Sequence, residues 1–147
     1  MIKDFFTKDT ISFAEECKGW EEAIRLCGYP LLESGCIEEG YVEACIDNVK
    51  KNGPYIVLAP LVAMPHAKAP EYVKKICMSY LNLKKPVDVL DNPQRPAKMF
   101  IMLAAKDGES HLECMASLGK VLSDKEKLEG LINAACVEDV LEIIGSV

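Results

Sequence analysis

The stretch Tyr55-Ile56-Val57-Leu58 marks the point in this 147-residue chain where helical spacing of apolar residues gives way to short β-rich runs. Two further runs of this kind follow, at 76–83 and 98–105. We therefore predict largely buried strands at all three places. Between Pro86 and Pro96 we predict a long surface loop, because its prolines would interrupt a regular ladder.

Helices are expected before and after these strands. The first predicted helix stops at Gly28 and Pro30. Its apolar side chains recur at helical spacing: Cys17, Trp20, Ala23, Ile24, Cys27. Further helices are predicted over 38–51, 110–122, 124–135 and 138–144. Three Ser-x-x-Glu capping boxes mark expected helix starts: Ser12 with Glu15, Ser110 with Glu113, Ser123 with Glu126.

This order of elements predicts the fold class. Helices before, between and after strands indicate an α/β fold, a three-layer sandwich with a small mixed β-sheet flanked by helices. Half of the residues are apolar and 27% are charged, as in average globular proteins. We expect a single domain spanning residues 1–147.

Composition also excludes several classes of function. A net charge of -6 and a pI near 5.0 argue against nucleic-acid binding, which relies on clustered Lys and Arg. The longest apolar stretch, 55–65, is too short to cross a bilayer, so no direct membrane insertion is expected. Seven cysteines without a Cys-x-x-Cys pair, and a start without a signal peptide, indicate a reduced cytoplasmic chain.

The chain has only two histidines, His66 and His111, so any imidazole chemistry must use one or both. His66 follows a predicted strand and Pro65, whose ring fixes its own φ and stiffens the segment. Strand ends are where α/β sheets commonly place ligand chemistry. A neutral nitrogen lone pair on His66 could therefore accept a phosphoryl group.

His111 directly follows Ser110, the expected N-cap, and would lie in the first turn of a helix. Backbone N–H groups there lack intrahelical partners and favour an anion. If the fold brings the two histidines together, His111 and the helix start could stabilise a phosphoryl group on His66. The chain lacks a P-loop pattern, so the expected donor is another protein rather than ATP.

Simpler readings of these residues stay open. His66 could be an ordinary loop histidine, and His111 a hydrogen-bonded histidine at the edge of the core. A zinc site of His66, His111 and Cys114 would lack a fourth ligand at recognisable spacing. A Cys–His hydrolase is disfavoured because no cysteine carries a glycine-rich nucleophile turn. No metal and no cofactor is predicted.

The segment around His66 resembles a known family. It is similar to the EIIA components of the bacterial sugar phosphotransferase system, of the mannitol/fructose type, and most to their ascorbate branch. The run that carries this likeness is Tyr55-Ile56-Val57-Leu58-Ala59-Pro60-Leu61-Val62-Ala63-Met64-Pro65-His66-Ala67-Lys68. The likeness extends over residues 5–145 through further short matches: Trp20-Glu21-Glu22-Ala23-Ile24-Arg25, Lys85-Pro86-Val87, Asp91-Asn92, His111-Leu112-Glu113, Leu122-Ser123-Asp124.

The resemblance implies a mannitol-type EIIA fold and a phosphotransferase with a phosphohistidine intermediate. His66 would take a phosphoryl group from phosphorylated HPr and pass it to the EIIB component of a sugar permease, with His111 in support. The expected partner surface is an apolar patch around Met64, Pro65 and His66 with a polar rim. Met64, Leu61 and Val62 could be part of it, although strand burial would explain Leu61 and Val62 equally well. The alternative is a regulatory interaction module switched by histidine phosphorylation. Sugar specificity and homodimer formation stay open.

Two departures from the family pattern bear on the site. Leu61 stands where the ascorbate branch usually has glycine. If that position requires a positive φ, leucine would be strained there. The arginine and the acid that precede the histidine in the mannitol branch have no residue-for-residue match here.

Overall fold

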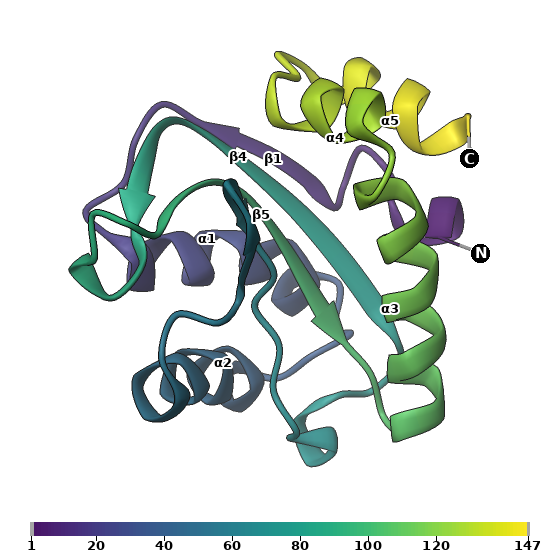
Figure 1. The fold of residues 1–147 in the computed structure, drawn as a ribbon. Helices are drawn as coiled ribbons and strands as arrows, with labels where there is room; N and C mark the ends of the chain where they lie inside the picture. Colours follow the sequence, from purple (N-terminus) through teal and green to yellow (C-terminus); the bar gives the residue numbers. More distant parts are fainter. Residues whose placement is uncertain (1, 147) are drawn as a thin grey trace.

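The computed structural model describes residues 2–146 and places a five-stranded mixed sheet between two layers of helices (Figure 1). The strands, in the order β1-β4-β5-β3-β2, are β1 (Ile11–Ala14), β4 (Cys77–Asp88), β5 (Pro96–Ala104), β3 (Leu61–Ala63) and β2 (Val57–Ala59). Two neighbouring pairs are parallel, β1 with β4 and β3 with β5, and the other two are antiparallel. The predicted α/β sandwich with a mixed sheet is confirmed.

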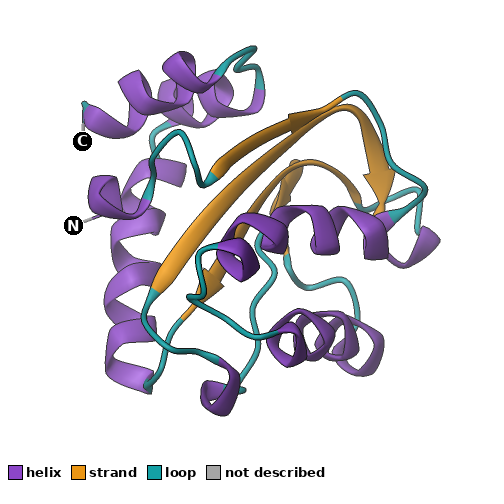
Figure 2. Ribbon diagram, turned by 180° about the vertical axis from the view of Figure 1, so that it is seen from behind, coloured by secondary structure: helices purple, strands orange, loops and turns teal. Residues whose placement is uncertain are grey.

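Each face of the sheet is covered by its own set of helices. One face of the sheet carries α1 (Trp20–Glu33) and α2 (Glu39–Asn52); the other carries α3 (Gly108–Leu122), α4 (Lys125–Ile132) and α5 (Val137–Gly145) (Figure 2). Short 3₁₀ turns complete the described chain: η1 (Ile2–Phe5), η2 (Pro70–Tyr72), η3 (Val89–Asp91). No helix between residues 2 and 146 combines the length and apolar character that a bilayer crossing requires.

Strict alternation along the central strands explains the two cores. In β4, Leu81 and Leu83 pack with the α1–α2 layer, whereas Met78 and Tyr80 pack with the α3–α5 layer. The segment 100–104 of β5 alternates in the same way. Side chains of a strand point to opposite faces in turn, so a sheet covered on both faces needs nearly continuous apolar strands. This is why the sequence shows apolar runs without a helical period.

The prediction of a helix start at Ser12 is wrong. Ser12 lies in β1, which pairs in parallel with residues 80–83 of β4. Ile11, beside it, is buried. The capping pattern is local, whereas a strand is stabilised by a partner far away in sequence, and here the sheet ladder prevails.

The prediction that the first helix stops at Gly28 and Pro30 is also wrong, because α1 continues through both residues to Glu33. A Cβ on Gly28 would lie 3.0 Å from Val42 Cγ2 of α2 and 3.2 Å from the side chain of Met102. Gly28 therefore permits close packing of α1 rather than ending it. The helix ends at Glu33, with Ser34 as its C-cap, and Gly35 follows in the left-handed region with a φ of 78°.

The other two capping boxes are displaced from the true N-caps. Asp107 caps α3, its Oδ1 accepting a hydrogen bond from Ser110 N at 2.7 Å, and Asp124 caps α4. Ser123 is instead the C-cap of α3. These errors are small in position. The shift of the N-cap from Ser110 to Asp107 nevertheless changes the expected anion site at α3.

The predicted loop from Pro86 to Pro96 is shorter than expected, because β4 continues to Asp88. The register of β4 against β5 shifts between Asn82 and Val87. Pro86 lies within this irregular part of the strand, where it does not have to donate a ladder hydrogen bond.

Leu61, at the start of β3, has a φ of 71°. The register of β3 against β5 shifts between Leu61 and Val62, so the strand begins with an irregular residue. A left-handed conformation costs a non-glycine residue roughly 1–2 kcal/mol. The strain expected for a leucine at this position is therefore present.

We predict that Leu61→Gly is more stable than Leu61→Ala by about 1 kcal/mol. Both changes remove most of the side chain, but only glycine relieves the strain. This relief exceeds the cost of the greater conformational entropy that glycine loses on folding. The free energy of unfolding from urea titration measures the difference. At Ala116, an exposed residue of α3, alanine should instead be more stable than glycine. The same order at both positions would contradict strain at Leu61.

Candidate functional site

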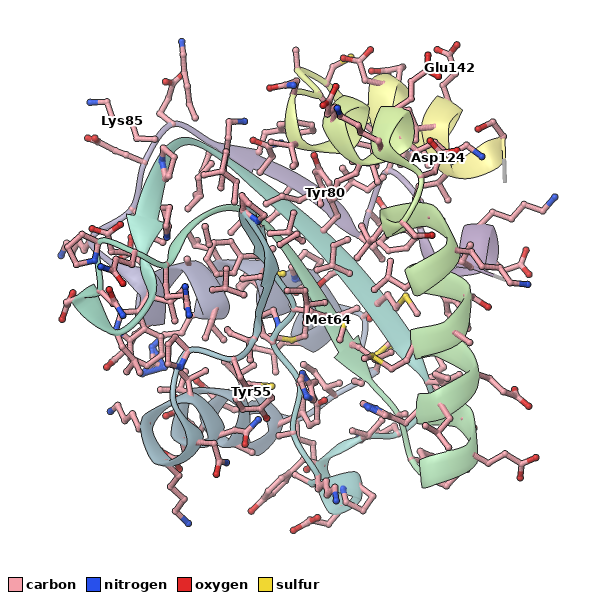
Figure 3. The ribbon with its side chains drawn as sticks, in the orientation of Figure 1. Tyr55, Met64, Tyr80, Lys85, Asp124 and Glu142 are labelled. Atoms are coloured by element: carbon pink, nitrogen blue, oxygen red, sulfur yellow. The ribbon has the colours of Figure 1, made fainter. Side chains whose placement is uncertain are left out.

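An open cleft of about 870 Å³ lies beside α2, the segment that follows β3, η2 and the start of α3. Both histidines line it. Figure 3 shows Tyr55 close to α2, with Met64 deeper in the molecule. Sixteen further residues complete the lining, among them Asn48, Tyr55, Lys68, Tyr72 and Asp107.

The structure brings His66 and His111 together. Their ring centroids are 5.7 Å apart and their planes are inclined by 43°. The parallel pairing of β3 with β5 is the cause: their carboxyl ends lie at the same edge of the sheet, His66 follows β3, and β5 leads into α3. Sequence spacing alone could not show this meeting.

A hydrogen bond determines which nitrogen of His66 is free to react. Nδ1 lies 2.8 Å from the carbonyl oxygen of Met64. A carbonyl can only accept, so Nδ1 carries the proton and donates it. In the neutral ring, Nε2 then keeps its lone pair. His66 is partly exposed in the cleft, so this nitrogen is a candidate nucleophile.

The main chain around His66 is fastened from two sides. Leu103 of β5 donates its N–H to Pro65 O at 3.1 Å, which extends the β3–β5 alignment past the end of the ladder. From α2, Asn48 Nδ2 donates to His66 O at 2.9 Å, and Tyr41 Oη accepts from Ala67 N at 3.2 Å. A segment without regular secondary structure is thereby held in one conformation.

His111 offers its side chain, not its backbone amide, to the cleft. Its N–H donates to Asp107 O at 3.1 Å, and the carboxylate of Asp107 accepts from Ser110 N. The backbone N–H groups of Ser110 and His111 are therefore not free to bind an anion, because the N-cap residue accepts from both.

Burial lowers the pKa of His111, and the positive charges of His66 and Lys68 lower it further. All three causes favour the uncharged imidazole. At neutral pH the ring is therefore neutral and can donate a hydrogen bond from one nitrogen. Below pH 6.5 the folded chain resists protonation of His111, so this group's contribution to stability is lost as the pH falls.

Three side chains of the cleft were not identified from the sequence: Asn48, Tyr55 and Lys68. The ring of Tyr55 stands at 86° to that of His66, with centroids 5.7 Å apart. Asn48 contacts both residues. The only signal in the sequence is that Asn48 follows Tyr41 by two helical turns and so shares its face of α2.

The charges of the cleft are balanced. Three lysines and three acids line it: Lys51, Lys68, Lys106, Asp47, Glu71, Asp107. Among residues 2–146, no three His, Cys, Asp or Glu side chains are arranged to hold a metal ion. The zinc site weighed for His66, His111 and Cys114 therefore has no structural support.

The predicted partner patch is wrong in most of its residues. Met64, Pro65 and Val62 are buried, because they extend β3 into the core of the sheet. Large apolar side chains are exposed instead in the cleft lining and beside His111. These are Tyr55 (47%), Tyr72 (38%) and Leu112 (69%), and we call them the apolar rim.

Several known proteins resemble this chain in sequence and in fold. The mannitol-specific cryptic phosphotransferase enzyme IIA component of Escherichia coli strain K12 is 36% identical over 143 residues, 97% of each chain. A solution structure of the E. coli protein of that name matches with a TM-score of 0.90 and 37% identity, covering 99% of both chains. The ascorbate-specific PTS system EIIA component of E. coli is 32% identical over 92% of this chain and 88% of its own.

A further structure shows a related chain with its partner. The E. coli complex of enzyme IIA for mannitol with phosphorylated enzyme IIB matches with a TM-score of 0.84 and 26% identity, over 97% of this chain and 98% of that one. The family model for the phosphoenolpyruvate-dependent sugar phosphotransferase system, EIIA 2, matches residues 4–147. The chain belongs to this EIIA family, as the run ending in His66 had suggested.

Proposed function

We propose that this chain is a cytoplasmic phosphocarrier that takes a phosphoryl group from phosphorylated HPr onto His66 and passes it to an EIIB component of a sugar permease. The observation that carries the proposal is the paired imidazoles of His66 and His111 in an open cleft, with Nδ1 of His66 occupied by Met64 O. Membership of the EIIA family supports the class of reaction. The related complex with phosphorylated enzyme IIB supports the acceptor.

The transfer step requires little of the protein beyond position and charge. The lone pair of His66 Nε2 attacks the phosphorus of the donor's phosphohistidine. The new N–P bond forms as the donor's P–N bond breaks, and that electron pair returns to the donor's nitrogen. Nδ1 keeps its proton and its bond to Met64 O throughout, so the carrier has no proton to lose. Attack by a nucleophile of EIIB on the same phosphorus then restores the free histidine.

His111 is suited to receive the phosphoryl oxygens. In the unphosphorylated chain its pKa is lowered, so it does not place a positive charge beside the reacting imidazole of His66. Once His66 carries the phosphoryl group, the negative oxygens favour a protonated His111. Lys68, whose charge acts on His111, lies in the same cleft and adds to this stabilisation.

The apolar rim is the proposed docking surface for both partners. Leu112 is 69% exposed, and Tyr55 and Tyr72 are partly open to solvent. Exposed aromatic and aliphatic side chains around a reactive group are typical anchors of a protein interface. The net charge of -6 favours encounter with basic partners.

Incubation with enzyme I, HPr and phosphoenolpyruvate should add one acid-labile phosphate to the wild type and none to His66→Ala, as measured by intact mass. His111→Ala should still be labelled but about 10- to 100-fold more slowly, because stabilisation is lost while the nucleophile remains. Omitting enzyme I gives the control. An unlabelled wild type would overturn the phosphocarrier, and labelled protein that no EIIB discharges would favour the regulatory module.

The pKa of His111, measured by NMR titration, should rise when His66 is phosphorylated. Lys68→Gln should raise it in the unphosphorylated chain, since removal of a nearby cation favours protonation. Lys120→Gln, at the far end of α3, is the control and should leave it unchanged. A pKa of His111 that does not respond to phosphate would separate this residue from the reacting group.

Leu112→Gln should lower kcat/KM for phosphorylation by HPr about five- to tenfold, because an interface anchor is lost. Tyr29→Gln, at another exposed large side chain (57%) on α1, is the control and should have little effect. The small donor phosphoramidate needs no docking surface, so it should label both variants at the wild-type rate. A slower reaction of Leu112→Gln with phosphoramidate would show that the change damages the site itself.

A further inference from the structure

We propose that Asn48 is a positioning residue for the chemistry of His66, because its side-chain amide holds the main chain of His66 and the phenol of Tyr55 at the same time. Asn48 Nδ2 lies 2.9 Å from His66 O and 2.6 Å from Tyr55 Oη. Its Oδ1 accepts a hydrogen bond from Asn52 Nδ2 at 2.7 Å. The inference rests on the proposed phosphoryl transfer at His66.

The orientation of this amide follows from its partners. The carbonyl of His66 can only accept, so the NH₂ group of Asn48 must face it. That group has two hydrogens and two acceptors within reach, His66 O and Tyr55 Oη. The remaining oxygen faces Asn52 on the next turn of α2. Every polar atom of the side chain therefore has a partner, and the amide is held in one orientation.

The need for such a residue arises where the sheet ends. β3 ends at Ala63, so the carbonyl of His66 has no ladder partner. Two side chains of α2, two turns apart, bind the main chain there instead. Tyr41, buried, accepts from Ala67 N, and Asn48, partly exposed, donates to His66 O. Helix α2 therefore holds in place the segment that carries the proposed nucleophile.

These contacts restrict His66 at three points. Met64 O binds one ring nitrogen, Asn48 binds the carbonyl, and the ring of Tyr55 stands perpendicular to the imidazole. Tyr55 is 47% exposed, and its hydroxyl bond to Asn48 limits its rotation. Loss of Asn48 would release the carbonyl and the phenol together. The direction of Nε2 toward an incoming phosphorus would then be less well defined.

A structural role alone predicts a different outcome. A residue that only stabilises the fold lowers the free energy of unfolding, yet molecules that remain folded react at the normal rate. A positioning residue lowers the rate constant at saturating donor and alters the state of the His66 ring. Substitution of Asn48, which is partly exposed at the cleft, allows the two roles to be separated.

The test compares Asn48→Ala and Asn48→Asp with Asn133→Ala, an exposed asparagine at the end of α4. Asn48→Asp keeps the shape of the side chain, but its carboxylate has no N–H to donate. Phosphorylation is followed by intact mass with phosphoramidate and with phosphorylated HPr. We expect both Asn48 variants to react about tenfold more slowly at saturating concentrations of either donor, and Asn133→Ala to react normally.

Three further measurements complete the experiment. Tyr55→Phe keeps the ring beside His66 but removes the acceptor for Asn48, so its rate should fall between wild type and Asn48→Ala. The ¹⁵N spectrum of the His66 ring should show one tautomer, with the proton on Nδ1, in wild type and a mixture in Asn48→Ala. Urea titration gives the folded fraction of each variant at the assay temperature.

The inference is overturned if folded Asn48→Ala reacts at the wild-type rate with both donors, or if only the half-saturating concentration of HPr changes. It is also overturned if the ring spectrum of His66 is unchanged. Failure of the proposed function looks different, because wild type would then accept phosphate from neither donor. The ring spectrum would still decide whether Asn48 positions His66.

Discussion

The parallel pairing of β3 with β5 is the constraint on which the rest of the site depends. It aligns Ala63 with Phe100 and continues beyond the ladder through the bond from Leu103 N to Pro65 O. Parallel strands end at the same edge of a sheet, so the segment after β3 and the helix after β5 must start side by side. The meeting of His66 with His111 is a direct consequence. A change in this register would separate the two rings and move His66 away from α2.

The electrostatics of the cleft suit a group that gains and loses a phosphate. Lysines and acids are equal in number among its lining residues, and the neutral form of His111 is favoured. A permanently positive cleft would retain the phosphoryl group, whereas a carrier must release it to the next protein. The carboxylate of Asp107, which accepts from Ser110 N, offsets the positive potential at the start of α3. In the proposed transfer, phosphate is stabilised by side chains such as His111, whose charge responds to its arrival.

Sequence reasoning succeeded where the signal was local and chemical. The apolar runs located β4 and β5, and the segment from Tyr55 to Lys68 led to the correct family. It failed where two local patterns compete, as at Ser12, whose capping box lies in a strand, and at Gly28, which permits close packing within α1 instead of ending it. It also placed Met64 on the surface, although the side chain is fully buried. The conformation or burial of each of these residues is decided by contacts with residues distant in sequence.

The sequence by itself determined which residues can do the chemistry, since only two imidazoles exist and Pro65 stiffens the approach to one of them. Compared with the family pattern it also indicated the strain at Leu61, because leucine stands where the ascorbate branch usually has glycine, the residue that adopts positive φ most readily. Only the tertiary structure decided that His66 meets His111, that Met64 O selects the tautomer, and that Asn48 of α2 reaches the histidine's carbonyl. These are contacts between separate elements, and their geometry is set by strand register and helix packing, which no local pattern encodes.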